Sequence, residues 1–153
     1  MIKIEVDSRE IDAALKRLEA STDNLKPAFD DIGAGLVSNI QDQLGQGQTP
    51  WGDAFAPLAK PRKRQGKRRA GDVPLNDTRK HIYKRIDHVA SHNEVEVAWY
   101  GDSLLGFAHQ FGSHKNHITA RPFMPIKDDA VDLPADWEAE ILDTLTSHIE
   151  KAQ

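Results

Sequence analysis

The chain has 153 residues, 39% of them hydrophobic and 29% charged, which predicts a globular fold with one domain spanning residues 1–153. It contains no cysteine, so a disulfide framework, a thiolate zinc site and a cysteine nucleophile are excluded. The net charge is −4, and no apolar run is long enough for a secretory signal or a membrane helix, so we expect a cytoplasmic protein without a membrane partner.

The N-terminal residues predict a strand followed by a helix. Apolar residues at every second position indicate a strand with one wet face: Ile2, Ile4 and Val6. Helical spacing and a possible N-cap at Ser8 then indicate a first helix, with apolar residues Ile11, Leu15 and Leu18.

A second, longer helix is predicted from Asp23 or Asn24 to the glycines at 45 and 47. Its apolar stripe recurs at intervals of three and four residues: Phe29, Ile32, Leu36, Ile40 and Leu44. Gly33 and Gly35 lie inside that stripe, where each costs about 1 kcal/mol relative to alanine. Close packing against a neighbouring element is one reason to place glycine there.

Residues 45–76 show neither helical nor strand periodicity, and we expect a long flexible loop. Seven basic residues fall within ten positions of it: Lys60, Arg62, Lys63, Arg64, Lys67, Arg68 and Arg69. The rest of the chain has 13 basic and 24 acidic residues. The sequence therefore predicts an acidic body with one basic loop. Before the basic run, Trp51 and Phe55 are costly to leave in water and predict a docked segment.

The second half predicts a short helix, a hairpin and a final helix. The short helix is capped by Asp77 or Thr78 and presents Ile82 and Ile86. The hairpin pairs residues 86–89 with 95–99 across the turn residues 91–93. The final helix spans Asp136 to Ile149, with apolar residues at Trp137, Ile141, Leu145 and Ile149.

Between the hairpin and the last helix we expect a loop. It begins with a short apolar segment, Leu104 to Phe111, which Gly112 ends. Helices and strands do not alternate regularly, which argues against a doubly wound parallel sheet. We expect an α+β fold with a small, mainly antiparallel sheet packed against several helices.

Catalytic motifs are missing from the sequence. No serine lies in a G-x-S-x-G elbow, and no phosphate-binding or dinucleotide glycine motif occurs. The acid pairs at 30–31 and 128–129 fall at expected helix starts, where carboxylates favour the helix dipole. We expect no enzyme activity and no cofactor.

Two binding alternatives remain open. His109, His114 and His117 lie close in sequence, but no acidic residue occurs between Asp102 and Asp128. Three histidines are the largest local ligand set, and we favour solvated loop histidines over a metal site. The basic run could neutralise several phosphates of a nucleic acid, although it lacks the interleaved aromatic residues that single-strand binders use. A solvated loop that contacts an acidic neighbouring subunit is the other interpretation.

Four segments in this order resemble the phage virion morphogenesis family, the tail-completion and neck proteins of Mu-like and related tailed phages. They are TPWGDAFAPLAKPR (49–62), VPLNDTRKHIYKRI (73–86), FAHQFG (107–112) and ITARPFMPI (118–126). Arg79 stands where the family pattern has glycine, and Thr119 replaces a proline. The most specific part is HQFG followed by ARPF, and the resemblance covers about half of the chain.

The resemblance implies a non-catalytic protein of a tailed phage or prophage that acts in tail completion or head–tail joining in the bacterial host cytoplasm or in the virion. It implies other tail or neck proteins as partners. We also expect a ring of identical copies, because ring closure by a head-to-tail interface would explain one acidic face and one basic loop on the same subunit. We expect Arg121 to fork onto a carboxylate or onto carbonyl groups and Phe123 to supply apolar area. The other residues expected in this anchor, for fold or for subunit contact, are His109, Gln110, Phe111, Gly112 and Pro122.

Overall fold

The computed structural model describes residues 2–4, 9–20, 25–58, 74–75 and 82–151. The helices in these residues are α1 (Arg9–Glu19), α2 (Lys26–Gln46), the 3-10 helix η1 (Tyr83–Arg85), α3 (Ser103–Phe111) and α4 (Ala135–Lys151). The strands are β1 (Ile2–Ile4), β2 (Ile86–Ala90), β3 (Val95–Trp99), β4 (Ile126–Lys127) and β5 (Ala130–Val131).

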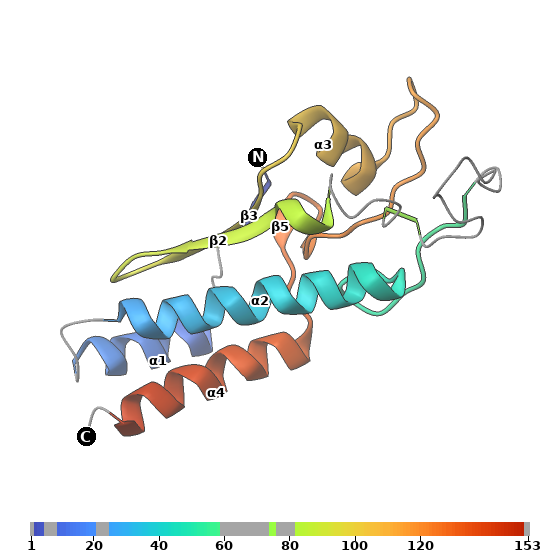
Figure 1. The fold of residues 1–153 in the computed structure, drawn as a ribbon. Helices are drawn as coiled ribbons and strands as arrows, with labels where there is room; N and C mark the ends of the chain where they lie inside the picture. Colours follow the sequence, from blue (N-terminus) through green and yellow to red (C-terminus); the bar gives the residue numbers. More distant parts are fainter. Residues whose placement is uncertain (1, 5–8, 21–24, 59–73, 76–81, 152–153) are drawn as a thin grey trace.

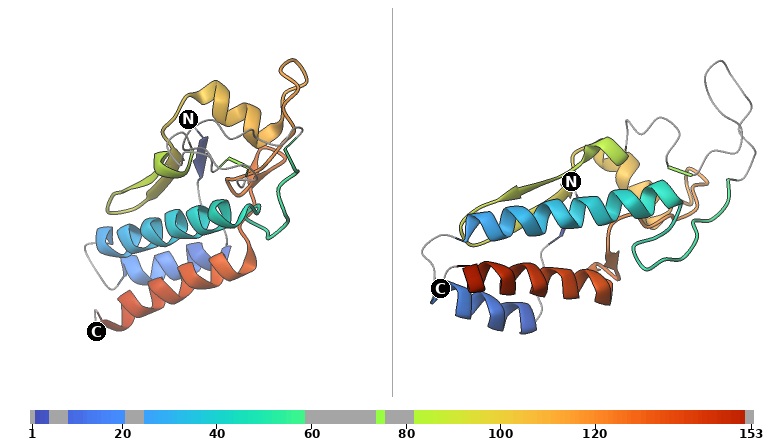
Figure 2. Two further views of the ribbon diagram at one scale, coloured as in Figure 1. Left: turned by 45° about the vertical axis from the view of Figure 1, so that its right-hand side comes forward. Right: turned by 60° about the horizontal axis from the view of Figure 1, so that its bottom comes forward.

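The long helix α2 lies between a small sheet and the other two long helices (Figures 1 and 2). The sheet is antiparallel with strand order β1-β3-β2, and the hairpin register pairs Ile86 with Trp99 and Ala90 with Val95. Helices α1 and α4 pack on the far side of α2 from the sheet. The predicted α+β class with a small antiparallel sheet is therefore confirmed.

One apolar core joins the layers. The stripe predicted on α2 is buried along its whole length, from Phe29 to Leu44, and it meets the buried face of α4. Trp99 at the end of β3 is fully buried at the sheet side of the same core. Burial of side chains at helical period on α2 and α4 is the main source of stability in this part of the molecule.

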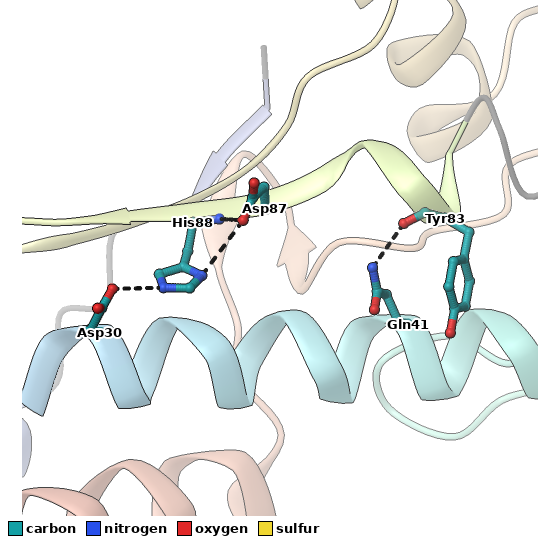
Figure 3. A network of polar contacts seen from close by, with 5 residues as sticks. All are labelled: Asp30, Gln41, Tyr83, Asp87 and His88. Carbon is teal, nitrogen blue, oxygen red and sulfur yellow. Dashed lines mark hydrogen bonds and ion pairs between the residues drawn. The ribbon is translucent and has the colours of Figure 1, made fainter.

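A glycine lets α2 approach the sheet closely. A Cβ atom at Gly33 would lie 2.3 Å from Cδ2 of His88 on β2, so only glycine fits there. The His88 ring then reaches Asp30 of α2, with 3.0 Å between His88 Nε2 and Asp30 Oδ1 (Figure 3). Close packing thus explains Gly33, whereas a Cβ at Gly35 would meet nothing within 4 Å.

The same helix is tied to the chain just before β2. Gln41 Nε2 donates a hydrogen bond of 3.0 Å to the carbonyl of Tyr83 in η1 (Figure 3). On the opposite side of α2, His148 Nε2 of α4 lies 2.9 Å from Asp31 Oδ2. The adjacent acids Asp30 and Asp31 therefore link α2 to one element on each side of it.

The C-terminal end of α2 agrees with the expected signal, whereas its N-terminal end does not. Helix α2 stops at Gln46 because Gly47 adopts a left-handed conformation, with φ of 72°, and donates its N–H to the last turn. Gly45 lies inside the helix, so the predicted loop begins two residues later than expected. Leu25 occupies the N-cap position of α2. The alternatives Asp23 and Asn24 lie outside the described residues.

Three local predictions were wrong. Residues 103–111 form a helix and not a loop, because Asp102 caps it by accepting a hydrogen bond from the Leu104 N–H at 3.0 Å. The short helix expected from Asp77 or Thr78 does not include Ile86, which belongs to β2; Tyr83–Arg85 form the 3-10 helix η1, and residues 76–81 lie outside the described residues. Asp128 and Asp129 do not start a helix: both have positive φ and form the two-residue turn between β4 and β5.

Candidate functional site

The motif that carries the family resemblance forms α3 and the segment behind it. Helix α3 rests on Trp99 through Gly106, where an added Cβ would lie 2.2 Å from the indole ring. Gly106 and Gln110 are its buried residues, and Leu105 is partly buried against the core, whereas Leu104, Phe107 and Phe111 are exposed. The helix therefore leaves three large apolar side chains exposed, whereas a surface helix usually turns such side chains toward the core.

Gln110 holds this orientation with four hydrogen bonds to backbone groups of the following segment. Its side-chain oxygen accepts from the N–H groups of Phe123 and Met124, each at 3.0 Å. Its amide nitrogen donates to the carbonyls of Met124 at 3.0 Å and Ile126 at 3.3 Å. The side chain is 1% exposed, so these backbone groups have little access to water and depend on it.

Arg121 ties the same segment to the region before the basic run. Its Nε donates to the Ala56 carbonyl at 2.7 Å, and Nη2 donates to the Pro57 carbonyl at 2.8 Å. Its own N–H donates to the His109 carbonyl at 2.7 Å, which connects it to α3. The predicted fork is thus present, with carbonyls as acceptors.

Phe123 and Gly112 complete the support. Phe123 is buried and meets the Trp99 ring edge to face, with 6.2 Å between the ring centres. Gly112 ends α3 with φ of 80° and lies against the backbone of Ile118 and Ala120, where a Cβ would be crowded. Pro122 is half-buried between Arg121 and Phe123.

His109 has a different environment from its neighbour Gln110. It is half-buried, and its Nδ1 atom is buried with no hydrogen-bond partner among the described residues. Burial lowers the pKa of His109 below the usual 6.5, and the nearby Arg121 guanidinium lowers it further. The structure therefore favours the neutral imidazole.

The outward side of α3 carries an apolar face, formed by Leu104, Phe107 and Phe111. Their exposed fractions are 80%, 47% and 44%. The two phenylalanine rings stack on each other, with 5.8 Å between centres. Large apolar side chains gathered on one exposed helix face are typical of an interaction surface.

Beside this apolar face lies the loop of residues 112–120, which borders a shallow hollow with Phe111, His114 and His117. No group of three or more metal-ligating side chains occurs among the described residues, which include all three histidines of the metal alternative. The structure therefore does not bring His109, His114 and His117 together as a ligand set.

The aromatic residues of the region before the basic run dock on the chain itself. Trp51 Nε1 donates to the Asp132 carbonyl at 3.0 Å, and Lys127 Nζ lies 3.9 Å from the centre of its ring. Phe55 is buried in the core. The seven basic residues predicted as an interaction site lie outside the described residues: Lys60, Arg62, Lys63, Arg64, Lys67, Arg68 and Arg69.

Sequence reasoning selected the supporting residues of this site but missed Leu104 and Phe107. The intervals from Leu104 to Phe107 and from Phe107 to Phe111 are three and four residues, which is itself a helical signal. This signal was missed because a loop was expected here. In addition, the buried residues of the helix are Gly106 and Gln110, which are not the large apolar residues that usually mark a buried face.

No helix among the described residues is long and apolar enough to cross a membrane. No curated protein and no solved structure matches the chain. The model of the phage virion morphogenesis family matches residues 6–150, nearly the whole chain. This extends the resemblance at residues 49–126 and indicates a structural role in phage assembly in preference to a catalytic one. The chain belongs to the phage virion morphogenesis family.

Proposed function

We propose that this protein acts in tail completion or head–tail joining, through contacts with other tail or neck proteins and with copies of itself in a ring. Assembly takes place in the cytoplasm of the bacterial host. The observation that carries the proposal is the apolar face of α3, which leaves three large apolar side chains in water.

The support beneath this face favours a binding role. Gln110 and Arg121 connect α3 to the segment 121–126 and to residues 56–57 through buried side chains. A surface fixed in this way loses little conformational freedom when a partner binds, which favours affinity. The buried residues of the motif thus position the apolar face, and the exposed residues bind.

The test removes the gene from a phage or prophage that encodes this protein and counts particles by electron microscopy. We expect heads and tails to form but to remain separate, with infectious particles restored by the wild-type gene from a plasmid. Normal joined particles without the gene would contradict the proposal.

A point variant connects this experiment to the surface. Leu104→Glu places a charge at the most exposed residue of the apolar face, and we expect it not to restore infectious particles. Ala130→Glu is the matched control, because Ala130 is an exposed apolar residue of β5 and is not part of α3. It should restore particles fully.

Nucleic-acid binding by the basic run is the second candidate function, and it rests on seven basic residues within ten positions. Such binding would weaken steeply with salt. Fluorescence anisotropy with labelled DNA between about 50 and 200 mM salt tests it. Absence of binding at the lower salt concentration removes this candidate.

A further inference from the structure

We propose that the apolar face of α3 binds a second copy of this chain, at an open apolar cavity on the opposite end of the molecule. This rests on the proposed function only in that a ring of identical copies needs a contact between them. The proposal assigns both halves of that contact to named residues.

The receiving cavity lies where α1, α2 and α4 meet the tip of the β2–β3 hairpin. It has a volume of about 190 Å³ and is lined mainly by apolar side chains of the three helices, among them Leu15, Phe29 and Ile141. Leu15 is partly exposed. Its lining at the hairpin includes Asn93, Glu94, Val95 and Glu96.

The size of the cavity suits the side chains on α3. An apolar cavity of about 150 Å³ in a protein is enough to bind benzene. A cavity of about 190 Å³ therefore has room for one phenylalanine ring or one leucine side chain. Leu104, Phe107 and Phe111 present such side chains on one short helix, so one can enter while the others cover the edge.

The charges around the two surfaces are complementary. Residues 103–127 contain no aspartate or glutamate, and they include Lys115 in the exposed loop after α3. The cavity instead has Glu94 and Glu96 in its lining. The adjacent helix α4 carries five acidic residues and one lysine. Opposite charges beside an apolar contact select the partner and orient it.

The two surfaces cannot meet within one copy. Strand β3 begins at Val95, which lines the cavity, and ends at Trp99, which supports α3 through Gly106. At about 3.3 Å per residue, the strand places them on the order of 13 Å apart. Figure 1 shows α3 beyond one end of the hairpin and the hairpin tip at the other. Such a head-to-tail contact leaves one free surface on each end, and it closes into a ring or continues.

Sedimentation velocity of the full chain over a range of concentrations tests the contact. We expect wild-type protein to self-associate and Leu104→Glu to do so at least about tenfold more weakly, so that it is monomeric where wild type associates. Ala130→Glu should match wild type, because Ala130 is an exposed residue of β5 that belongs neither to the cavity lining nor to α3. Wild-type protein that stays monomeric at its highest soluble concentration overturns the proposal.

A mixing experiment tests the head-to-tail geometry. Leu104→Glu disables the apolar face but keeps the cavity, and Leu15→Lys disables the cavity but keeps the apolar face. Each variant alone should be monomeric, and their mixture should give one-to-one pairs and nothing larger. Pairing of either variant with itself, or no pairing in the mixture, overturns the proposal.

Charge reversal supplies a variant set that leaves the core untouched. Glu94→Lys and Lys115→Glu each change an exposed residue, and each should weaken association. Both changes together should restore it, whereas additive weakening counts against the contact. The outcome is separable from the proposed function. If α3 instead binds a different tail protein, Leu104→Glu fails to restore particles while wild-type protein remains monomeric.

Discussion

The layer of long helices and the α3 end of this molecule are stabilised in different ways. In the helical layer, α2 and α4 bury apolar side chains at regular helical spacing, and the few polar links, such as Asp31 to His148, lie at the surface. At the α3 end, two buried polar side chains, Gln110 and Arg121, hold backbone groups of other segments.

The two regions should therefore differ in how well they tolerate substitution of their buried residues. A packed apolar layer accepts exchanges of similar volume at small cost. A side chain that satisfies several buried backbone groups has no equivalent substitute, because each group left unpaired carries its own penalty. The α3 end gains an exposed apolar face from this arrangement, since the buried positions of the helix are occupied by glycine and glutamine.

The largest effect is expected for Gln110→Leu. The change leaves two N–H and two carbonyl groups of residues 123–126 without this partner, and we expect the free energy of unfolding to fall by about 3 to 5 kcal/mol. Urea denaturation measures it. Gln41→Leu is the control, because Gln41 makes one such bond, to Tyr83, and should cost about 1 kcal/mol. Equal losses of unfolding free energy in the two variants would contradict a special role for the buried Gln110.

Arg121→Lys should have the next largest effect. Lysine keeps the charge but cannot reach the carbonyls of Ala56 and Pro57 with a fork, so we expect a loss of about 1 to 3 kcal/mol. Hydrogen–deuterium exchange should become faster in residues 48–58 and stay unchanged in α4. Arg85→Lys serves as the control, because it is the same substitution at an exposed residue. Uniformly faster exchange would show that Arg121 stabilises the whole fold and not this region.

Ile40→Val tests the other side of the comparison. Ile40 is fully buried on α2, and removing one methylene group should cost about 1 kcal/mol. Thermal unfolding measures the loss, and self-association should stay as in wild type. A change in self-association would mean that the helical layer and the α3 end are coupled.

The smallest effect concerns pH and His109. Because its pKa is lowered in the folded protein, the neutral ring is favoured there. Its contribution to stability is present above the usual pKa of 6.5 and is lost as pH falls through the lowered value. His109→Gln should therefore lose less stability than wild type between pH 7.5 and acidic pH, in paired urea titrations. Parallel curves would assign the pH dependence to other groups.

The elements that sequence analysis predicted well are those where one periodic pattern decides the structure. The stripe on α2 and the spacing on α4 correspond to buried faces. Strand β3 forms where its alternation predicted it, but it is buried on both faces at its end, since Val97, Ala98 and Trp99 are all buried. The predicted fork of Arg121 also exists, since few other arrangements satisfy a guanidinium beside proline.

The elements that it missed depend on contacts distant in sequence. Helix α3 could not be recognised from burial periodicity, because Gly106 faces inward only on account of Trp99 and Gln110 only on account of residues 123–126. The turn at Asp128 and Asp129 was missed because the acidic pair resembles a helix start as much as a two-residue hairpin turn. The cavity near Leu15 and Glu94 combines four elements, and no local pattern predicts it.

The pairing of β1 with β3 has a practical consequence for any experiment on association. Ile2 to Ile4 cover one edge of β3, and their partners lie about 95 residues later in the chain. This strand is three residues long, so a substitution in it that weakens its pairing would uncover that edge of β3. An uncovered β3 would offer a free strand edge to other molecules. Variants used to measure association should therefore keep residues 2–4 unchanged, so that this edge stays closed.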